Sequence, residues 1–169
     1  MLGKGFPMST RSIVVISAGL SQPSSTRLLA DRLADGVVTE LAARGITAHV
    51  ETVELRDVAH EVVNMTLSGF ASGPLKDVIE KVTAADGVIA VTPIFSASYS
   101  GLFKSFVDIL DKDALVGRPV LVGATGGTGR HSLAPVGTMT FTFTDAQNAA
   151  MSYTIDGVSG TNALTRLPF

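Results

Sequence analysis

The sequence predicts an α/β fold in which a doubly wound parallel sheet carries helices on both faces. Three observations lead to this prediction. Short runs of apolar, β-branched residues recur from residue 13 to about residue 124, as is typical of strands covered on both faces. Amphipathic helical patterns separate these runs, and such alternation indicates a doubly wound sheet. The length of 169 residues suits one ordinary domain with a single core.

Four segments are predicted as strands. In chain order they are IVVI at 13–16, AHVETVEL at 48–55, VIAV at 88–91 and VLVGA at 120–124. The segment at 48–55 mixes polar and apolar residues, so one of its faces is expected to be wetter than the other. Met65 and Phe70 are assigned to the loop before the second predicted helix.

Three amphipathic segments predict helices between these strands. The first follows Ser24 and Ser25, which can cap a helix, repeats leucine or valine every four residues and stops at Gly45. The second begins at Pro74, a residue favoured in a first helical turn. The third covers about residues 102–110 and is apolar along one face. Each helix therefore has one face that can cover the sheet.

The composition changes near Pro135. From there onward the only charged residues are Asp145, Asp156 and Arg166, and TMTFTFT alternates threonine with apolar residues. Alternation with a period of two predicts two antiparallel strands, joined through DAQN as a β-hairpin. The predicted organisation is a flexible leader at 1–11, a ligand-binding domain at 12–134 and an atypical segment at 135–169. Residues 138–144 either take a fifth position in the sheet or leave its edge exposed.

Composition limits the classes of partner and compartment. Thirteen basic and fifteen acidic residues give a net charge of −2, without a block of like charge. Neither nucleic acid nor a membrane is therefore expected as a partner, and small molecules are favoured. The absence of cysteine excludes disulfides and thiolate catalysis and fits a reducing cytoplasm, which is the predicted location. No metal site is expected.

The loops that follow residues 16, 91 and 124 are the candidate functional segments, because ligands of open α/β sheets bind beyond the carboxyl ends of the strands. The first loop, SAGLSQPSSTR, leads into a helix whose unpaired N–H groups can hold a phosphate. The alternative is a serine-rich loop with an ordinary cap. Its hydroxylated candidates are Ser17, Ser21, Ser24, Ser25 and Thr26.

The second and third loops favour a flat ring. In TPIFSAS, Pro93 lacks an N–H and fixes one dihedral angle, while the following residues can direct backbone groups into a cleft. In GATGGTGRHS, the glycines leave room for a ring to approach closely, although a flexible connector is the alternative. Three such loops at successive strand ends together predict one binding cleft.

These motifs resemble those of the NAD(P)H-dependent FMN reductase family, within the flavodoxin-like superfamily. The resemblance covers about residues 12–134. Its most specific part joins the TP turn, the YSGLFK helix start and the ATGG loop in that order. The similar branch contains flavin reductases that supply reduced FMN to alkanesulfonate monooxygenases. The family continues with another helix and a last sheet strand where this chain has PVGTMTFTFTDAQ.

The resemblance implies a cofactor-binding set in three parts. Many family members carry an arginine where this chain has Ser21, so the charged contact is either missing here or supplied by Arg27. The five hydroxylated residues of the first loop would surround the FMN phosphate. The edge of the isoalloxazine ring would be held mainly by the backbone of Pro93, Ile94, Phe95 and Ser96. Its other side would be closed by Thr125, Gly126 and Gly127.

The activity implied is hydride transfer from NADPH or NADH to FMN, in which the cofactors carry the chemistry and no protein group serves as acid or nucleophile. Reduced FMN would then leave for a monooxygenase. The alternatives are an FMN-bound quinone or azo reductase, a non-enzymatic electron carrier, or a product made inactive by its unusual ending. The family resemblance also implies a homodimer or homotetramer. No residue of the sequence favours NADPH over NADH.

Overall fold

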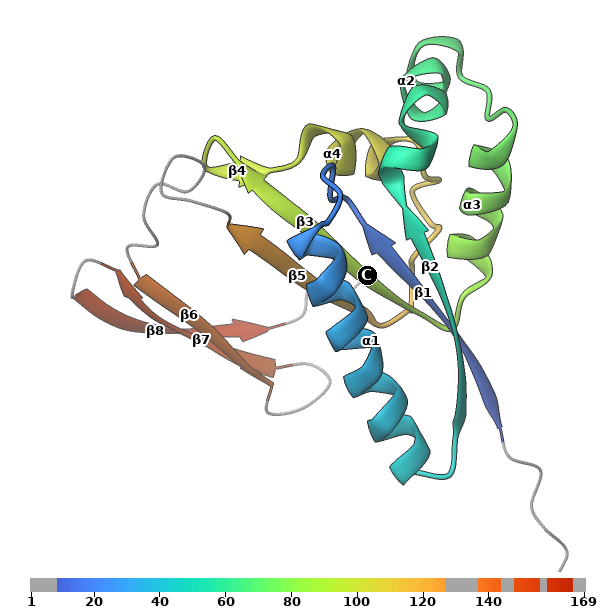
Figure 1. The fold of residues 1–169 in the computed structure, drawn as a ribbon. Coiled ribbons are helices and arrows are strands. Elements are labelled where there is room, and N and C mark those ends of the chain that lie inside the picture. Colours follow the sequence, from blue (N-terminus) through green and yellow to red (C-terminus); the bar gives the residue numbers. More distant parts are fainter. Residues whose placement is uncertain (1–8, 127–136, 144–147, 156–157, 166–169) are drawn as a thin grey trace, which may run out of the picture. The chain divides into compact units, whose positions relative to one another are not determined.

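The computed structural model describes residues 9–126, 137–143, 148–155 and 158–165, and it divides into a unit of residues 1–131 and a unit of residues 132–169. The first unit alternates strands and helices, as the sequence predicts (Figure 1). β1 begins at Thr10, inside the segment predicted as a leader. The elements of this unit are β1 (Thr10–Ser17), α1 (Ser25–Ala43), β2 (Thr47–Glu54), the short helix η1 (Leu55–Val58), α2 (Ala59–Ser68), α3 (Pro74–Ala84), β3 (Gly87–Phe95), β4 (Ser98–Tyr99), α4 (Gly101–Asp108) and β5 (Val120–Gly126).

The sheet of the first unit is parallel in the order β2–β1–β3–β5. The two-residue β4 pairs antiparallel with the last residues of β3. The doubly wound parallel sheet predicted from the sequence is therefore confirmed. The chain moves from β1 outward to β2 and then returns to β3 on the other side of β1. This change of direction places a crevice between the carboxyl ends of β1 and β3, where ligands of such sheets bind.

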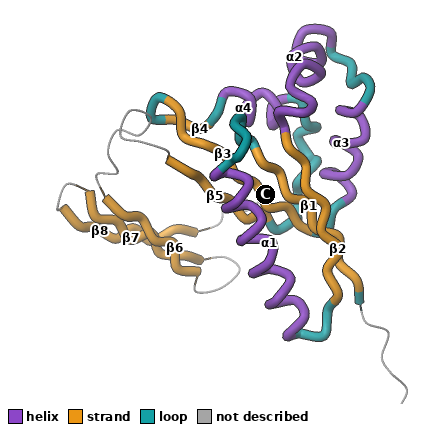
Figure 2. The backbone as a smooth tube through the Cα atoms, viewed as in Figure 1, coloured by secondary structure: helices purple, strands orange, loops and turns teal. Residues whose placement is uncertain are grey.

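Helix α1 covers one face of the sheet (Figure 2). Its Ala30 and Ala34 are buried against Val15 of β1 and Val91 of β3. Ser24 caps the helix by accepting a hydrogen bond from the Arg27 N–H at 3.2 Å. After the helix, Gly45 has φ +71°, a left-handed conformation that glycine adopts without strain. The cap and stop predicted from the sequence thus bound this helix.

Helices α2, α3 and α4 cover the opposite face and enclose the larger apolar core. Its fully buried side chains include Leu55 of η1, Leu75 of α3 and Phe106 of α4. The assignment of Met65 to a loop is wrong, because this residue lies within α2 and packs against the core. Phe70 follows the helix, beyond Gly69, and is exposed.

Two hydrogen bonds join the Asp86 side chain to the start of β1. The carboxylate accepts from the Ser12 N–H at 2.8 Å and from Arg11 Nη1 at 3.0 Å. The Ser12 hydrogen bond, followed by that of Arg11, lowers the pKa of Asp86. Because the folded pKa lies below the unfolded value of about 3.9, this carboxylate stabilises the fold above about pH 4 and loses that effect as pH falls through the folded pKa.

We expect Asp86→Asn to lower the melting temperature at neutral pH and to leave it little changed in strong acid. Thermal unfolding of both proteins between about pH 2 and pH 7 measures this difference. The exposed Glu40, which makes no hydrogen bond or ion pair with any residue that the structure describes, provides the control variant Glu40→Gln. A difference between wild type and Asp86→Asn that stays constant across the pH range would contradict the assignment.

The second unit contains β6 (Gly137–Phe143), β7 (Asn148–Ile155) and β8 (Val158–Thr165). β6 and β7 pair antiparallel, which confirms the predicted hairpin. β8 adds a third antiparallel strand that the sequence analysis did not anticipate. β6 belongs to the separate three-stranded sheet β6–β7–β8 and pairs with no described strand of the parallel sheet, so the alternative in which residues 138–144 extend the parallel sheet is wrong. No helix within the described parts of the chain is long and apolar enough to cross a membrane.

β5 forms the last strand of the parallel sheet on its side, with β3 as its partner. Val120, Leu121 and Val122 at its start are exposed. In the first unit, this edge therefore presents apolar side chains and backbone groups that no neighbouring strand of the sheet covers.

Candidate functional site

The carboxyl ends of β1, β3 and β5 enclose a pocket of about 220 Å³. All three candidate loops contribute to it, as expected from the common direction of parallel strands. The lining residues are Gly19, Leu20, Ser21, Ser25, Thr26, Pro93, Ile94, Phe95 and Thr125.

The first loop meets the pocket at the N-terminus of α1. Ser25 and Thr26 are the first two residues of this 19-residue helix, so unpaired backbone N–H groups and a partial positive charge lie beside their hydroxyls. Gly19 packs so closely on the loop that a Cβ atom there would lie 2.0 Å from Ser24 Oγ. The absence of a side chain at residue 19 thus allows the loop to fold back onto the helix start.

Hydrogen bonds around Thr92 hold the second loop. Its Oγ1 donates to the Pro93 carbonyl at 3.1 Å and accepts from the Ser100 N–H at 3.0 Å. Ser96 and Ala97 connect β3 to β4 with φ values of +48° and +64°, and positive φ at both central residues is what a two-residue hairpin turn of type I′ requires. Two adjacent non-glycine residues in this region store strain, a feature that concentrates at functional sites.

The third loop is tied directly to the first. The hydroxyls of Thr26, at the start of α1, and Thr125, near the end of β5, form a hydrogen bond of 2.8 Å across 99 residues of sequence. Both residues line the pocket. This bond fixes the helix N-terminus against the end of β5, so two of the three predicted loops form one wall.

The pocket unites seven of the twelve residues predicted to bind the cofactor. Ser17 is buried at the end of β1, and its Oγ has no hydrogen-bond partner among the described residues. Ser24 is used as the cap of α1, and Ser96 is exposed in the hairpin turn. Gly126 ends β5 outside the lining set, and Gly127 lies outside the described residues. The seven in the pocket are Ser21, Ser25, Thr26, Pro93, Ile94, Phe95 and Thr125.

Gly19 and Leu20 also line the pocket, although the sequence analysis selected only hydroxylated residues from their loop. A glycine between a strand end and a helix start was the available signal for Gly19, because close packing at such a turn requires a missing side chain. Leu20 carried no comparable signal. A leucine in a polar loop is unremarkable in sequence, and only the fold shows which side of the loop it faces.

A charged hollow of about 310 Å³ borders the first loop and is lined in part by Gln22, Ser24 and Arg56. Arg27, considered above as a phosphate ligand, lines this hollow and not the pocket. Its guanidinium pairs with Asp31 at 2.8 Å and with Glu54 at 2.7 Å. The hydrogen bond to Asp31 is the main cause that raises the pKa of Arg27. The guanidinium is therefore charged, and its charge is already paired with Asp31 and Glu54.

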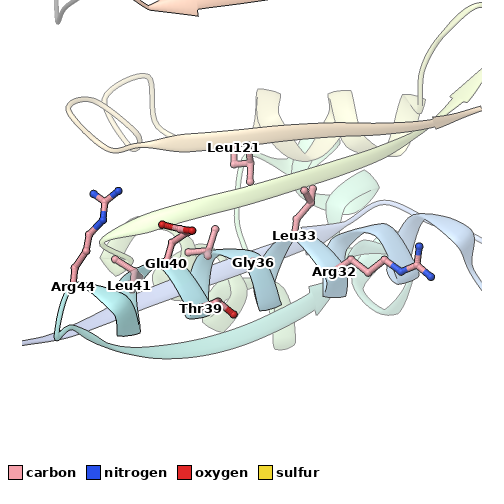
Figure 3. Close-up of a pocket in the computed structure, with 9 residues that line it drawn as sticks. Arg32, Leu33, Gly36, Thr39, Glu40, Leu41, Arg44 and Leu121 are labelled. Carbon is pink, nitrogen blue, oxygen red and sulfur yellow. The ribbon is translucent and has the colours of Figure 1, made fainter.

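A wider groove of about 570 Å³ lies between α1 and β5 (Figure 3). Leu33 and Leu41 of α1 and Leu121 of β5 contribute its apolar surface, and Arg32, Glu40 and Arg44 add charged side chains. None of its lining residues belongs to the three loops at the strand ends. It therefore lacks a helix N-terminus suited to a phosphate, and its hydroxyl, that of Thr39, already donates to the Asp35 carbonyl oxygen at 2.8 Å.

Comparison with known proteins identifies the family. The model of the family described as NADPH-dependent FMN reductase matches residues 11–153. The chain belongs to the NADPH-dependent FMN reductase family. This result confirms the resemblance found in the sequence motifs. The match extends past residue 134, where the sequence resemblance was expected to end.

Relatives in the FMN reductase family agree in sequence and in fold. An FMN reductase (NADPH) of Pseudomonas aeruginosa is 33% identical over 121 residues, which cover 72% of this chain and 62% of that protein. A solved oxidoreductase from Corynebacterium diphtheriae gives a TM-score of 0.69 at 44% identity, covering 73% of this chain and 68% of that chain. The apo form of NADH:FMN oxidoreductase (EMOB) gives a TM-score of 0.61 at 35% identity, covering 73% of this chain and 63% of that chain. The chain thus spans less than two thirds of the length of the P. aeruginosa protein.

The pocket fits the chemistry of FMN, the substrate named in this family. The N-terminus of α1, with the hydroxyls of Ser25 and Thr26, suits a phosphate. An apolar surface suited to a ring comes from three consecutive residues of the second loop, Pro93, Ile94 and Phe95. The buried, unpartnered Ser17 Oγ is a further polar group at the same end of the sheet.

Proposed function

We propose that this protein is an NAD(P)H-dependent FMN reductase, which transfers a hydride from a nicotinamide to FMN. The main support is the pocket, which combines a helix N-terminus suited to a phosphate with an apolar turn suited to a ring. FMN would supply the hydride acceptor. Membership of the FMN reductase family supports the same activity.

We assign the phosphate end of the pocket to Ser21, Ser25 and Thr26. Their hydroxyls and the first N–H groups of α1 would donate hydrogen bonds to phosphate oxygens. Ser24 would act indirectly, because its Oγ already accepts from the Arg27 N–H. We propose Ser17 as an additional polar group near this end, since its buried hydroxyl lacks a partner among the described residues.

We assign the ring end to Pro93, Ile94 and Phe95. The Thr92 hydrogen bonds and the β3–β4 turn would hold this segment in place before the ring arrives. Ser96 would shape that turn by its backbone. The opposite wall would come from Thr125, with Gly126 and Gly127 following it in sequence. These residues orient the ring and exclude water, and none of them is required to transfer a proton.

The test uses absorbance to measure how fast the purified protein oxidises NADPH and NADH, with and without FMN. We expect rapid oxidation of at least one nicotinamide only when FMN is present. Oxidation that proceeds equally without any flavin would contradict the proposal. The dialysed protein should be colourless if FMN is a released substrate. Retained yellow colour, with electron transfer to a quinone or azo dye, would instead favour an FMN-bound reductase of those acceptors.

We further propose a cytoplasmic homodimer or homotetramer that delivers reduced FMN to a monooxygenase. The exposed apolar side chains of Val63, Leu67 and Phe70, in and after α2, are suitable for contact between subunits. The absence of cysteine supports a reducing compartment. Light scattering after size-exclusion chromatography would measure the number of subunits, and a monomer at micromolar concentration would contradict this assembly.

A further inference from the structure

Arg56 contacts the first loop from the charged hollow and is not among the residues that line the pocket. Its Nη1 donates to the Ser21 carbonyl oxygen at 3.0 Å, across 35 residues of sequence. In the amide orientation that the neighbouring donors favour, the Gln22 side-chain oxygen accepts from Arg56 Nη2 at 2.6 Å. Arg56 and Gln22 line the charged hollow, whereas Ser21 lines the pocket. One guanidinium therefore binds two successive residues of the loop, Ser21 and Gln22.

Glu54 holds this guanidinium in position. Its Oε2 lies 2.5 Å from Arg56 Nη2, and its Oε1 accepts from Arg27 Nη1 at 2.7 Å. The side chains of Arg56 and Glu54 are only 18% and 15% exposed. A carboxylate at the end of β2 thus connects the residue that grips the loop with the first turn of α1. Partly buried ion pairs of this kind are screened less by solvent than exposed ones.

Arg56 belongs to a cluster of five charged side chains, and the charges of this cluster argue against a direct role of Arg56 in binding an anion. Arg27 and Arg56 are balanced by Glu54 and Asp31, and Asp57 lies a further 3.5 Å from Arg56 Nε. Two positive and three negative side chains give the cluster a net charge of −1. Arg56 is therefore placed to position the loop, and its charge is already compensated.

We propose that Arg56, held by Glu54, positions the Ser21–Ser24 turn for the phosphate of FMN and so makes the site prefer FMN to riboflavin. Because the Ser21 carbonyl oxygen is bound to Arg56, an acceptor that would repel phosphate oxygens is kept facing the hollow. Donors fixed before the ligand arrives bind it with a smaller loss of entropy. Arg56 would thereby offset the absence of a positive side chain at residue 21. This inference rests on the proposed function.

The experiment compares dissociation constants for FMN and for riboflavin, which lacks the phosphate, measured by flavin fluorescence. We expect Arg56→Met to weaken FMN binding about tenfold or more and to change riboflavin binding less than about twofold. Glu54→Gln, which keeps the volume of the side chain, should shift the FMN to riboflavin ratio in the same direction. The double variant should be less affected than the product of the two single effects, because both act through one contact.

The matched control is Lys81→Met, which breaks another ion pair of β2, that of Lys81 with Glu51 at 2.8 Å, without touching the loop. It should leave both affinities unchanged. Equal weakening of FMN and riboflavin in Arg56→Met and in Glu54→Gln, or no change in either ligand, would overturn the inference. A wild-type protein that binds neither flavin would instead overturn the proposed function itself. The two failures are thus distinguished by the wild-type titration.

Discussion

Gly19→Ala is expected to weaken FMN binding by roughly ten- to a hundredfold, which corresponds to about 1.4–2.8 kcal/mol. The added methyl group would lie 2.0 Å from Ser24 Oγ and 3.1 Å from Thr26 Cβ, so the loop has to move. Rotating the Ser24 hydroxyl away would break its bond to the Arg27 N–H, and loss of such a cap costs about 0.5–2 kcal/mol. Both the helix start and the proposed phosphate donors would shift.

The affinity of Gly19→Ala is measured by titrating the protein into FMN and following flavin fluorescence. Gly36→Ala is the matched control, since a Cβ atom at Gly36 would meet nothing within 4 Å. In the interior of α1 this change should stabilise the helix by about 0.5–1 kcal/mol and leave FMN affinity unaltered. An affinity of Gly19→Ala equal to that of wild type would show that the loop does not contact the ligand.

Phe106→Ala is expected to lower the free energy of unfolding by about 3–5 kcal/mol. Phe106 is fully buried in the core formed by α2, α3, α4 and the sheet, so its removal loses apolar burial and leaves a cavity. Since domains of this size are stable by only about 5–15 kcal/mol, the variant should populate unfolded protein at moderate temperature. Flavin binding should decline in proportion to the folded fraction.

Urea denaturation followed by circular dichroism measures this loss. Val107→Ala is the matched control, because Val107 is the next residue of α4 and is 42% exposed. Its effect should stay within about 1 kcal/mol, as for most surface substitutions. If the two variants lose equal stability, Phe106 is not the core residue that its burial indicates.

The ion pairs and the pocket together suggest how the first loop is organised. One side of it faces the pocket through Gly19, Ser21 and Ser25. The Ser21 carbonyl oxygen of the same loop accepts a hydrogen bond from Arg56, which is paired with Glu54 at the end of β2. Substitutions on either side of this loop should therefore weaken FMN binding more than riboflavin binding, whereas substitutions at the ring end, such as Ile94, should affect both flavins. This contrast tests which end of the pocket binds the phosphate.

The sequence predicted the sheet well because its signals are local. Three continuous apolar runs became β1, β3 and β5. β1 and β3 are buried on both faces over most of their apolar residues, as such runs predict, whereas the expected burial is wrong for the start of β5, which is exposed at the edge of the sheet. Ser24 and Gly45 predicted the ends of α1 because capping depends on a few adjacent residues. Helix α2 was missed because it has no capping signal like that of α1: its N-cap residue is Val58, which makes no side-chain cap hydrogen bond.

What the sequence determined by itself was the order of strands and helices, their approximate ends and the three loops at one edge of the sheet. Tertiary structure alone decided which residues of those loops face the pocket. Ser24 became a cap, Ser96 became an exposed turn residue, and Arg56 reached Ser21 from 35 residues away. The reason is physical: capping and apolar periodicity act between neighbours in the chain, whereas a pocket and its supports arise from side chains that only the packed sheet brings together.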